Sequence, residues 1–150
     1  MSRHHPAVIG AVALGGAIGA LLRWLLDQWL LAGWPWPTLT VNLLGSLALG
    51  VLTVVAARFA VPGWVRPGIG TGLLGGFTTF SAYVVQVHLL AGAEGSSSPG
   101  GVAAAGAYLL LTPLLCVGAA GLAMTGTERM LHTDLLFGGH VPDDPDRTLG

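Results

Sequence analysis

Four stretches of this sequence are each long enough and apolar enough to cross a lipid bilayer, and this limits the fold more than any other feature. They cover residues 7–26, 38–59, 67–90 and 101–124. A membrane-spanning helix needs about 20 mainly apolar residues. Because the bilayer core offers no water to backbone groups, such segments must satisfy their own hydrogen bonds as helices. The sequence therefore predicts an all-α integral membrane protein with four transmembrane helices.

The charge content supports the same class. Only 9% of the 150 residues are charged, against about 25% in a typical soluble domain. Hydrophobic residues make up 53% of the chain, and the mean hydropathy is +0.72. Six basic and seven acidic side chains cannot cover a soluble domain of this size, and the net charge of −1 gives no reason to expect a nucleic-acid partner.

The positions of the arginines predict how the chain is oriented in the membrane. Five of the six lie on the side of the N-terminus, namely Arg3, Arg58, Arg66, Arg129 and Arg147. Positive charge favours the cytoplasmic side, so we expect both termini in the cytoplasm of a multi-pass plasma-membrane protein. A cleaved signal sequence is the alternative for the first span, but Arg23 and Trp24 occupy the place of a small-residue cleavage site. We expect a four-helix transmembrane subunit over residues 1–127 and a polar tail, at most a short helix followed by disorder, over residues 128–150.

Polar side chains inside the spans are few and none near a span centre is charged. They are Asn42, Ser46, Thr78, Thr79, Ser81, Tyr83 and Thr112. Each needs a hydrogen-bond partner, because an unpaired polar group in hydrocarbon is costly. Proton-coupled pumps and drug antiporters use a titratable carboxylate in the membrane, so its absence argues against both classes. For Asn42, a plain interhelical hydrogen bond and an ion contact both remain open.

The stretch "GLLGGFTTFSAY", residues 72–83, predicts a break near the middle of the third helix. Two adjacent glycines weaken the helix, and the hydroxyls that follow can bond to nearby backbone. A broken membrane helix frees carbonyl groups that can coordinate a cation such as Na⁺. Phe80 and Tyr83 share one helix face, and their positive ring edges would suit a small anion, although ordinary core packing is the simpler explanation of the pair taken alone.

Small residues recur at four-residue spacing in the first three spans, for example at Gly15 and Gly19 and at Gly68, Gly72 and Gly76. This spacing is typical of helices whose backbones pack closely in a membrane. Four short helices leave little room for an internal passage, so a transport function would require an oligomer.

Three segments resemble the Fluc/CrcB family of bacterial fluoride channels: "GGAIGALLRW" (15–24), "PTLTVNLLGSLALG" (37–50) and "GTGLLGGFTTFSAY" (70–83). The resemblance implies four-helix subunits that pair as antiparallel dimers in the inner membrane. It implies two fluoride pathways along the dimer interface, through which toxic fluoride leaves the cell passively. It also implies a structural Na⁺ at the centre of the dimer.

The resemblance assigns roles to particular residues. It places Asn42, Phe80, Ser81, Tyr83, Tyr108 and Thr112 on the fluoride pathway, and it assigns the Na⁺-binding backbone carbonyls to Gly75 and Thr78. Many members carry Phe where this chain has Tyr83, whose phenol would either donate to fluoride or narrow the passage. The dimer partner is either a second copy of the chain or a paired paralogous subunit that faces the opposite way. The arginine bias toward one orientation is the reason to consider the second arrangement.

Two other functions remain to be weighed. A small multidrug-type four-helix exporter would need a carboxylate deep in the first helix. This chain has Gly and Ala there instead. A non-transporting membrane scaffold would show no ion flux at all. An enzyme is not expected, because the sequence contains no nucleophile–base pair and no cofactor motif, and the single cysteine, Cys116, lies in an apolar run.

Overall fold

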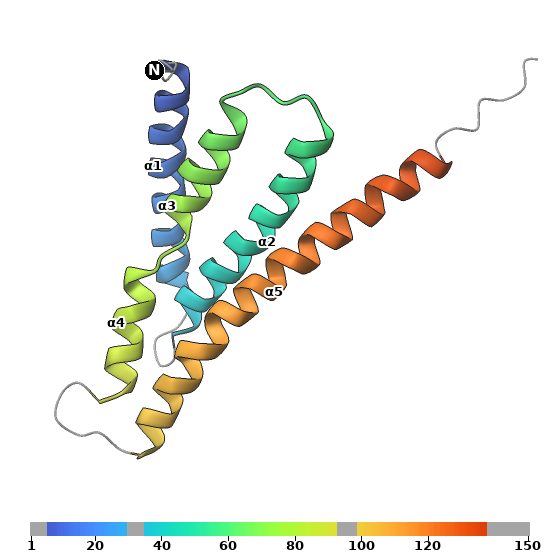
Figure 1. Cartoon of the computed structure of the whole chain (residues 1–150). Helices are drawn as coiled ribbons and strands as arrows, with labels where there is room; N and C mark the ends of the chain where they lie inside the picture. Colours follow the sequence, from blue (N-terminus) through green and yellow to red (C-terminus); the bar gives the residue numbers. More distant parts are fainter. Residues whose placement is uncertain (1–5, 30–34, 93–98, 138–150) are drawn as a thin grey trace, which may run out of the picture.

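The computed structural model describes residues 6–29, 35–92 and 99–137, and their regular secondary structure is entirely helical (Figure 1). The first two spans are α1 (Pro6–Trp29) and α2 (Trp36–Arg58). The third span consists of η1 (Arg66–Leu74), α3 (Gly75–Phe77) and α4 (Ser81–Leu90), and the fourth is α5 (Pro99–Phe137). Within the described residues, four helical segments are long and apolar enough to cross a membrane, which confirms the predicted spans.

The fourth helix is longer than predicted. α5 contains 39 residues, about 58 Å at the rise of an α-helix, whereas the hydrocarbon core of a bilayer is about 30 Å thick. The span expected over residues 101–124 lies within α5, and the helix continues without interruption to Phe137, so the first part of the predicted tail is helical. The hydroxyls of Thr125 and Thr127 donate to carbonyls one turn earlier in the same helix, so these polar groups are paired without interrupting it. The remainder of the predicted tail, residues 138–150, lies outside the described part of the chain.

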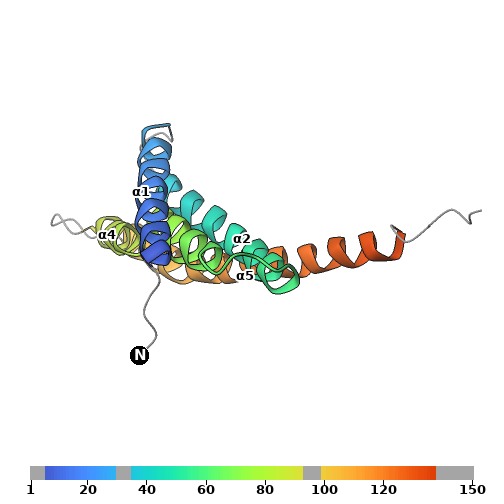
Figure 2. The ribbon, with the colours of Figure 1, turned by 90° about the horizontal axis from the view of Figure 1, so that it is seen from above.

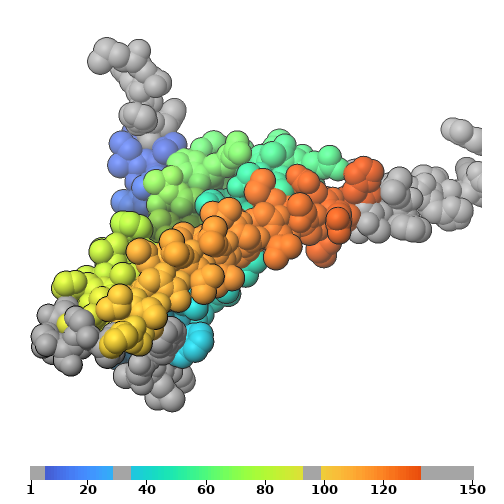
Figure 3. Space-filling model, turned by 60° about the horizontal axis from the view of Figure 1, so that its bottom comes forward, coloured from blue at the N-terminus to red at the C-terminus, as the bar shows by residue number. Residues whose placement is uncertain are grey.

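The helices pack in pairs rather than around a common axis. α1 lies along η1 and α3, α2 lies along α5, and α4 contacts α5. Viewed from above, α4 and the C-terminal half of α5 extend to opposite sides of α1 (Figure 2). The space-filling view shows α5 lying across one face of the molecule, with α4 beside its N-terminal half (Figure 3).

Glycines make the contact between α1 and the third span. A Cβ atom added at Gly15 or Gly19 would overlap backbone atoms of η1, and one added at Gly72 would lie 2.7 Å from the Val12 carbonyl oxygen. A Cβ at Gly76 would likewise collide with the backbone of α1. The predicted small-residue stripe is therefore a close backbone-to-backbone interface, which larger residues would push apart.

The predicted break in the third span is confirmed. The helix ends at Phe77, Thr78 is extended with φ −79° and ψ 159°, and a new helix begins at Ser81. The first half of this span also differs from an ordinary α-helix, because η1 is a nine-residue π-helix with the sequence RPGIGTGLL. Its three glycines lack a Cβ and tolerate the wider turn where the segment packs on α1.

Candidate functional site

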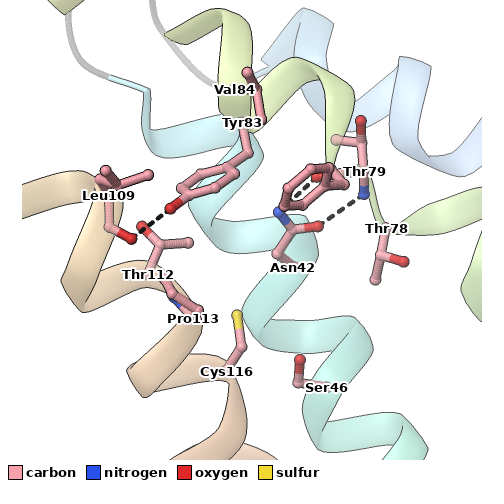
Figure 4. Close-up of a pocket in the computed structure, with 11 residues that line it drawn as sticks. Asn42, Ser46, Thr78, Thr79, Tyr83, Val84, Leu109, Thr112, Pro113 and Cys116 are labelled. Carbon is pink, nitrogen blue, oxygen red and sulfur yellow. Dashed lines mark hydrogen bonds between the residues drawn. The ribbon is translucent and has the colours of Figure 1, made fainter. Parts of the chain in front are cut away.

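A groove of about 480 Å³ opens between α2, α4, α5 and the break in the third span. It is lined by Asn42, Ser46, Thr78, Thr79, Phe80, Tyr83, Val84, Leu109, Thr112, Pro113 and Cys116 (Figure 4). None of these side chains carries a formal charge. The groove thus offers an ion amide, hydroxyl, thiol and aromatic groups, and no fixed charge that would hold it tightly.

Asn42 joins α2 to the break through two hydrogen bonds. Its Nδ2 donates to the Thr79 carbonyl oxygen at 2.9 Å, and its Oδ1 accepts from the Thr79 N–H at 2.8 Å (Figure 4). The amide therefore hydrogen-bonds to both the N–H and the carbonyl of Thr79, which is the pairing that a neighbouring β-strand would provide. Because Nδ2 carries two hydrogens, one N–H remains for another acceptor in the groove.

The same contacts explain why the helix stops here. In a continuous α-helix the Thr79 N–H would donate to the Gly75 carbonyl, and the Ala82 N–H would donate to the Thr78 carbonyl. Instead, the Thr79 N–H donates to Asn42 and the Ala82 N–H donates to Thr79 Oγ1 at 3.2 Å. The carbonyls of Gly75 and Thr78 thus lose their helical donors. These are the two carbonyls to which the family resemblance assigns a Na⁺ contact, and backbone oxygens are suitable ligands for that ion.

Three aromatic rings stand in series beside the groove. The ring centroids of Phe80 and Tyr83 are 5.7 Å apart with an interplanar angle of 47°, and those of Tyr83 and Tyr108 are 5.4 Å apart at 46°. Phe80 is 78% exposed, whereas Tyr83 and Tyr108 are buried. The ring of Phe80 is accordingly the aromatic group that an ion in the groove can approach directly.

The Tyr83 hydroxyl is already engaged. It donates to the Leu109 carbonyl oxygen across the gap between α4 and α5 (Figure 4). A phenol has a single O–H donor, so with this bond in place Tyr83 offers an ion its ring and not its hydrogen. Of the two roles considered for the phenol, direct donation to fluoride would require this bond to break.

A second polar chain lies next to the groove and was not predicted. Gln86 Nε2 donates to Thr38 Oγ1 at 2.7 Å, and the Tyr108 hydroxyl donates to Gln86 Oε1 at 2.9 Å. Spacing could have revealed it, because Thr38 lies one helical turn before Asn42, Gln86 follows Tyr83 by three residues, and such pairs share a helix face. The three helices thus carry polar side chains on the faces that meet.

The structure brings most of the predicted site residues together. Asn42, Thr78, Phe80, Tyr83 and Thr112 line the groove. Ser81 lies at the start of α4, with its Oγ 3.4 Å from Thr79 Oγ1, and Tyr108 packs behind Tyr83. Gly75 lies one turn before the break and is exposed. Among the described residues there is no group of three or more His, Cys, Asp or Glu side chains that could hold a metal ion.

Comparison with known proteins identifies the family to which this chain is similar. The family described as CrcB-like protein, Camphor Resistance (CrcB), matches residues 10–125. The chain is 42% identical over 127 residues to the fluoride-specific ion channel FluC of Rhodospirillum centenum, covering 80% of this chain and 96% of that protein. It is 43% identical over 129 residues to the channel of the same name from Erythrobacter litoralis, covering 76% and 88%.

A further relative, the fluoride-specific ion channel FluC 1 of Streptomyces coelicolor, is 41% identical over 133 residues, or 86% of this chain and 82% of that protein. The family match thus extends from α1 through most of α5 and includes every residue that lines the groove. This chain belongs to the CrcB family.

Proposed function

We propose that this protein is a fluoride-selective channel through which fluoride leaves the cytoplasm passively. The single observation that carries this proposal is the uncharged groove between α2, α4 and α5, found in a chain whose relatives are named fluoride-specific ion channels. Among the described residues, the groove is lined by no carboxylate, histidine or basic side chain, so the proposed activity is conduction and not catalysis or pumping.

The lining residues suit a small, strongly hydrated anion. To enter the groove, fluoride must exchange water for other hydrogen-bond donors, since an ion left without partners in hydrocarbon is very costly. The spare Asn42 N–H and the hydroxyl of Ser46 are such donors, and the exposed ring of Phe80 adds a positive edge. Neutral contacts hold the ion weakly at several points, which conduction requires, because a strongly binding site would not release it.

The groove of one chain is open on one side, and we propose that a second subunit closes it. Phe80 is 78% exposed beside the polar lining, and a single chain provides no wall opposite this ring. An antiparallel dimer, of two identical chains or of this chain with a paralogous subunit, would cover both grooves and give two pathways. The closed pathway would then combine residues of both subunits.

We also propose a structural Na⁺ at the centre of this dimer. The carbonyls of Gly75 and Thr78 are released from the helix by the hydrogen bonds of Asn42 and Thr79. Two subunits related by a twofold axis would together supply four such oxygens. The ion would hold the two breaks together and add positive charge close to the pathways, without taking part in transport itself.

Fluoride efflux from proteoliposomes, measured with a fluoride electrode, tests the function. Phe80→Ile removes the ring edge but keeps an apolar side chain, so we expect efflux to fall sharply. Phe59→Ile is the matched control, because Phe59 is 53% exposed at the end of α2 and away from the groove. Equal efflux from both variants would remove Phe80 from the pathway, and wild-type liposomes that release chloride as fast as fluoride would contradict the proposed selectivity.

Surface labelling tests the arrangement of the subunits. Gly63 lies in the turn between α2 and η1, and a Cβ added there meets no atom within 4 Å. In a Cys116→Ser background, Gly63→Cys should react with an impermeant maleimide on intact cells in about half of the molecules if one chain inserts both ways. Complete protection, together with efflux only when a paralogue is co-expressed, would assign the chain to a pair of unlike subunits.

A further inference from the structure

Pro113 leaves one carbonyl of α5 without its helical donor. Pro113 lies inside the helix, and proline has no backbone N–H. In an α-helix the N–H of residue 113 would donate to the carbonyl of Leu109. Because Leu109 and Pro113 both line the groove, the carbonyl freed in this way lies next to the proposed ion pathway.

The Tyr83 hydroxyl supplies the missing donor. It reaches from α4 to the Leu109 carbonyl on α5, 26 residues away in sequence. Tyr83 is only 6% exposed, and its ring is held between those of Phe80 and Tyr108. The proline and the phenol therefore fit one another: the first removes a donor from the helix, and the second restores one from a neighbouring helix.

We propose that Tyr83 is a positioning residue for the ion pathway, and that its hydroxyl and Pro113 act as a matched pair which keeps the Leu109 carbonyl from facing a passing anion. This inference rests on the proposed fluoride channel. It assigns the hydroxyl a role through Leu109 rather than a direct contact with the ion.

The physical reason is electrostatic. A carbonyl oxygen carries the negative end of the peptide dipole, and an uncapped one beside a narrow anion pathway would repel fluoride. A carbonyl without a partner inside the membrane is also costly in itself, because lipid offers no donor, so α5 would shift to find another one. Either effect would change the groove where the rings of Tyr83 and Phe80 contact one another.

Four proteins test the pair: wild type, Tyr83→Phe, Pro113→Ala and the double variant. Tyr83→Phe keeps the ring but loses the donor, and we expect efflux per folded protein to fall roughly two- to ten-fold, as for the loss of one hydrogen bond. Pro113→Ala restores a backbone N–H to the Leu109 carbonyl. In the double variant the helix therefore caps itself, and efflux should return toward that of Pro113→Ala alone.

The recovery in the double variant is the decisive result, because a hydroxyl that only filled space or contacted the ion would not be replaced by a backbone N–H on another helix. Thr125→Val is a matched control: it deletes a hydroxyl that donates to backbone carbonyls of α5 far from the groove, and efflux should not change. Unchanged efflux in Tyr83→Phe, or a double variant as slow as Tyr83→Phe, would overturn the proposal.

Unfolding temperatures keep this test separate from the proposed function. The same four proteins should show a loss of stability in Tyr83→Phe that is smaller when Pro113→Ala is also present, whether or not fluoride is transported. If Tyr83→Phe fails to fold alone, Pro113→Ala should restore folding, and additive losses would refute the pairing. A wild-type protein that transports no fluoride but shows this coupling would contradict the channel proposal and leave the hydrogen-bond pair established.

Discussion

Replacing Asn42 by alanine is the most direct test of how the break in the third span supports the groove. The side chain makes two hydrogen bonds to one residue, at 2.9 Å to the Thr79 carbonyl and at 2.8 Å from the Thr79 N–H. Asn42→Ala removes both bonds and also the spare N–H that faces the groove. The Thr79 N–H is then free to return to the Gly75 carbonyl and to extend the helix.

The size of the effect follows from these two bonds. Interhelical side-chain hydrogen bonds in membrane proteins contribute about 0.6 kcal/mol on average, and net values in proteins reach about 1.5 kcal/mol. Two bonds therefore contribute about 1 to 3 kcal/mol. This is less than the roughly 5–15 kcal/mol by which a domain is usually stable, so the variant should still fold. The same change in the barrier to conduction corresponds to a roughly 5- to 150-fold decrease in rate.

Fluoride efflux from liposomes is the assay, with gel filtration to show that the purified variant is monodisperse. Thr53→Val is a suitable control on the same helix, because its hydroxyl donates only to the Leu49 carbonyl of its own helix, at 2.8 Å, and lies outside the groove. We expect the control to match wild type. Wild-type efflux from folded Asn42→Ala would show that neither the amide nor the break it maintains is needed for conduction.

Three other parts of the molecule give independent predictions. Cys116 lines the groove, so a methanethiosulfonate reagent should inhibit efflux, and Cys116→Ser should remove that inhibition; a reagent without effect on wild type would place the pathway elsewhere. Na⁺ should raise the unfolding temperature more than K⁺ does. Thr79→Val should reduce this difference, because the Ala82 N–H loses its bond to Thr79 Oγ1 and can return to the Thr78 carbonyl. An unaltered difference would argue against a carbonyl site. Gly19→Ala should lower the stability by about 1–3 kcal/mol, because the added Cβ would overlap the backbone of η1. Gly10→Ala is the control: a Cβ added there meets no atom within 4 Å, so the unfolding temperature should not change.

Features that depend on local composition could be predicted from the sequence. The four spans follow from apolar length, and the break follows from adjacent glycines and hydroxyls that prefer to bond nearby backbone. The stripe of small residues predicted a close helix contact, which lies between α1 and η1. The resemblance to a known family added roles for Asn42, Phe80 and Tyr83, and the structure brings these three residues to one groove. The dimer, the Na⁺ and these roles stay predictions.

Features that depend on contacts between distant helices could not be predicted. The partner of the Tyr83 hydroxyl is set by a proline 30 residues later in the chain, and only the packing of α4 on α5 brings the two together. Gln86 lies near the end of the third span and was not among the predicted site residues, yet it joins Thr38 to Tyr108. The length of α5 beyond residue 124 could not be predicted, because a polar composition indicates solvent exposure and a helix that extends past the bilayer is exposed as well.

The double hydrogen bond between Asn42 and Thr79 has a consequence for how the protein is made. The donors and acceptors that interrupt the third span are 37 residues apart, and α2 enters the membrane first during synthesis. Until the third span packs against α2, no amide diverts the Thr79 N–H, and an unbroken helix satisfies the backbone best within the membrane. The break would therefore form only when these two spans meet, and a chain in which they did not meet would be inserted yet would lack the groove.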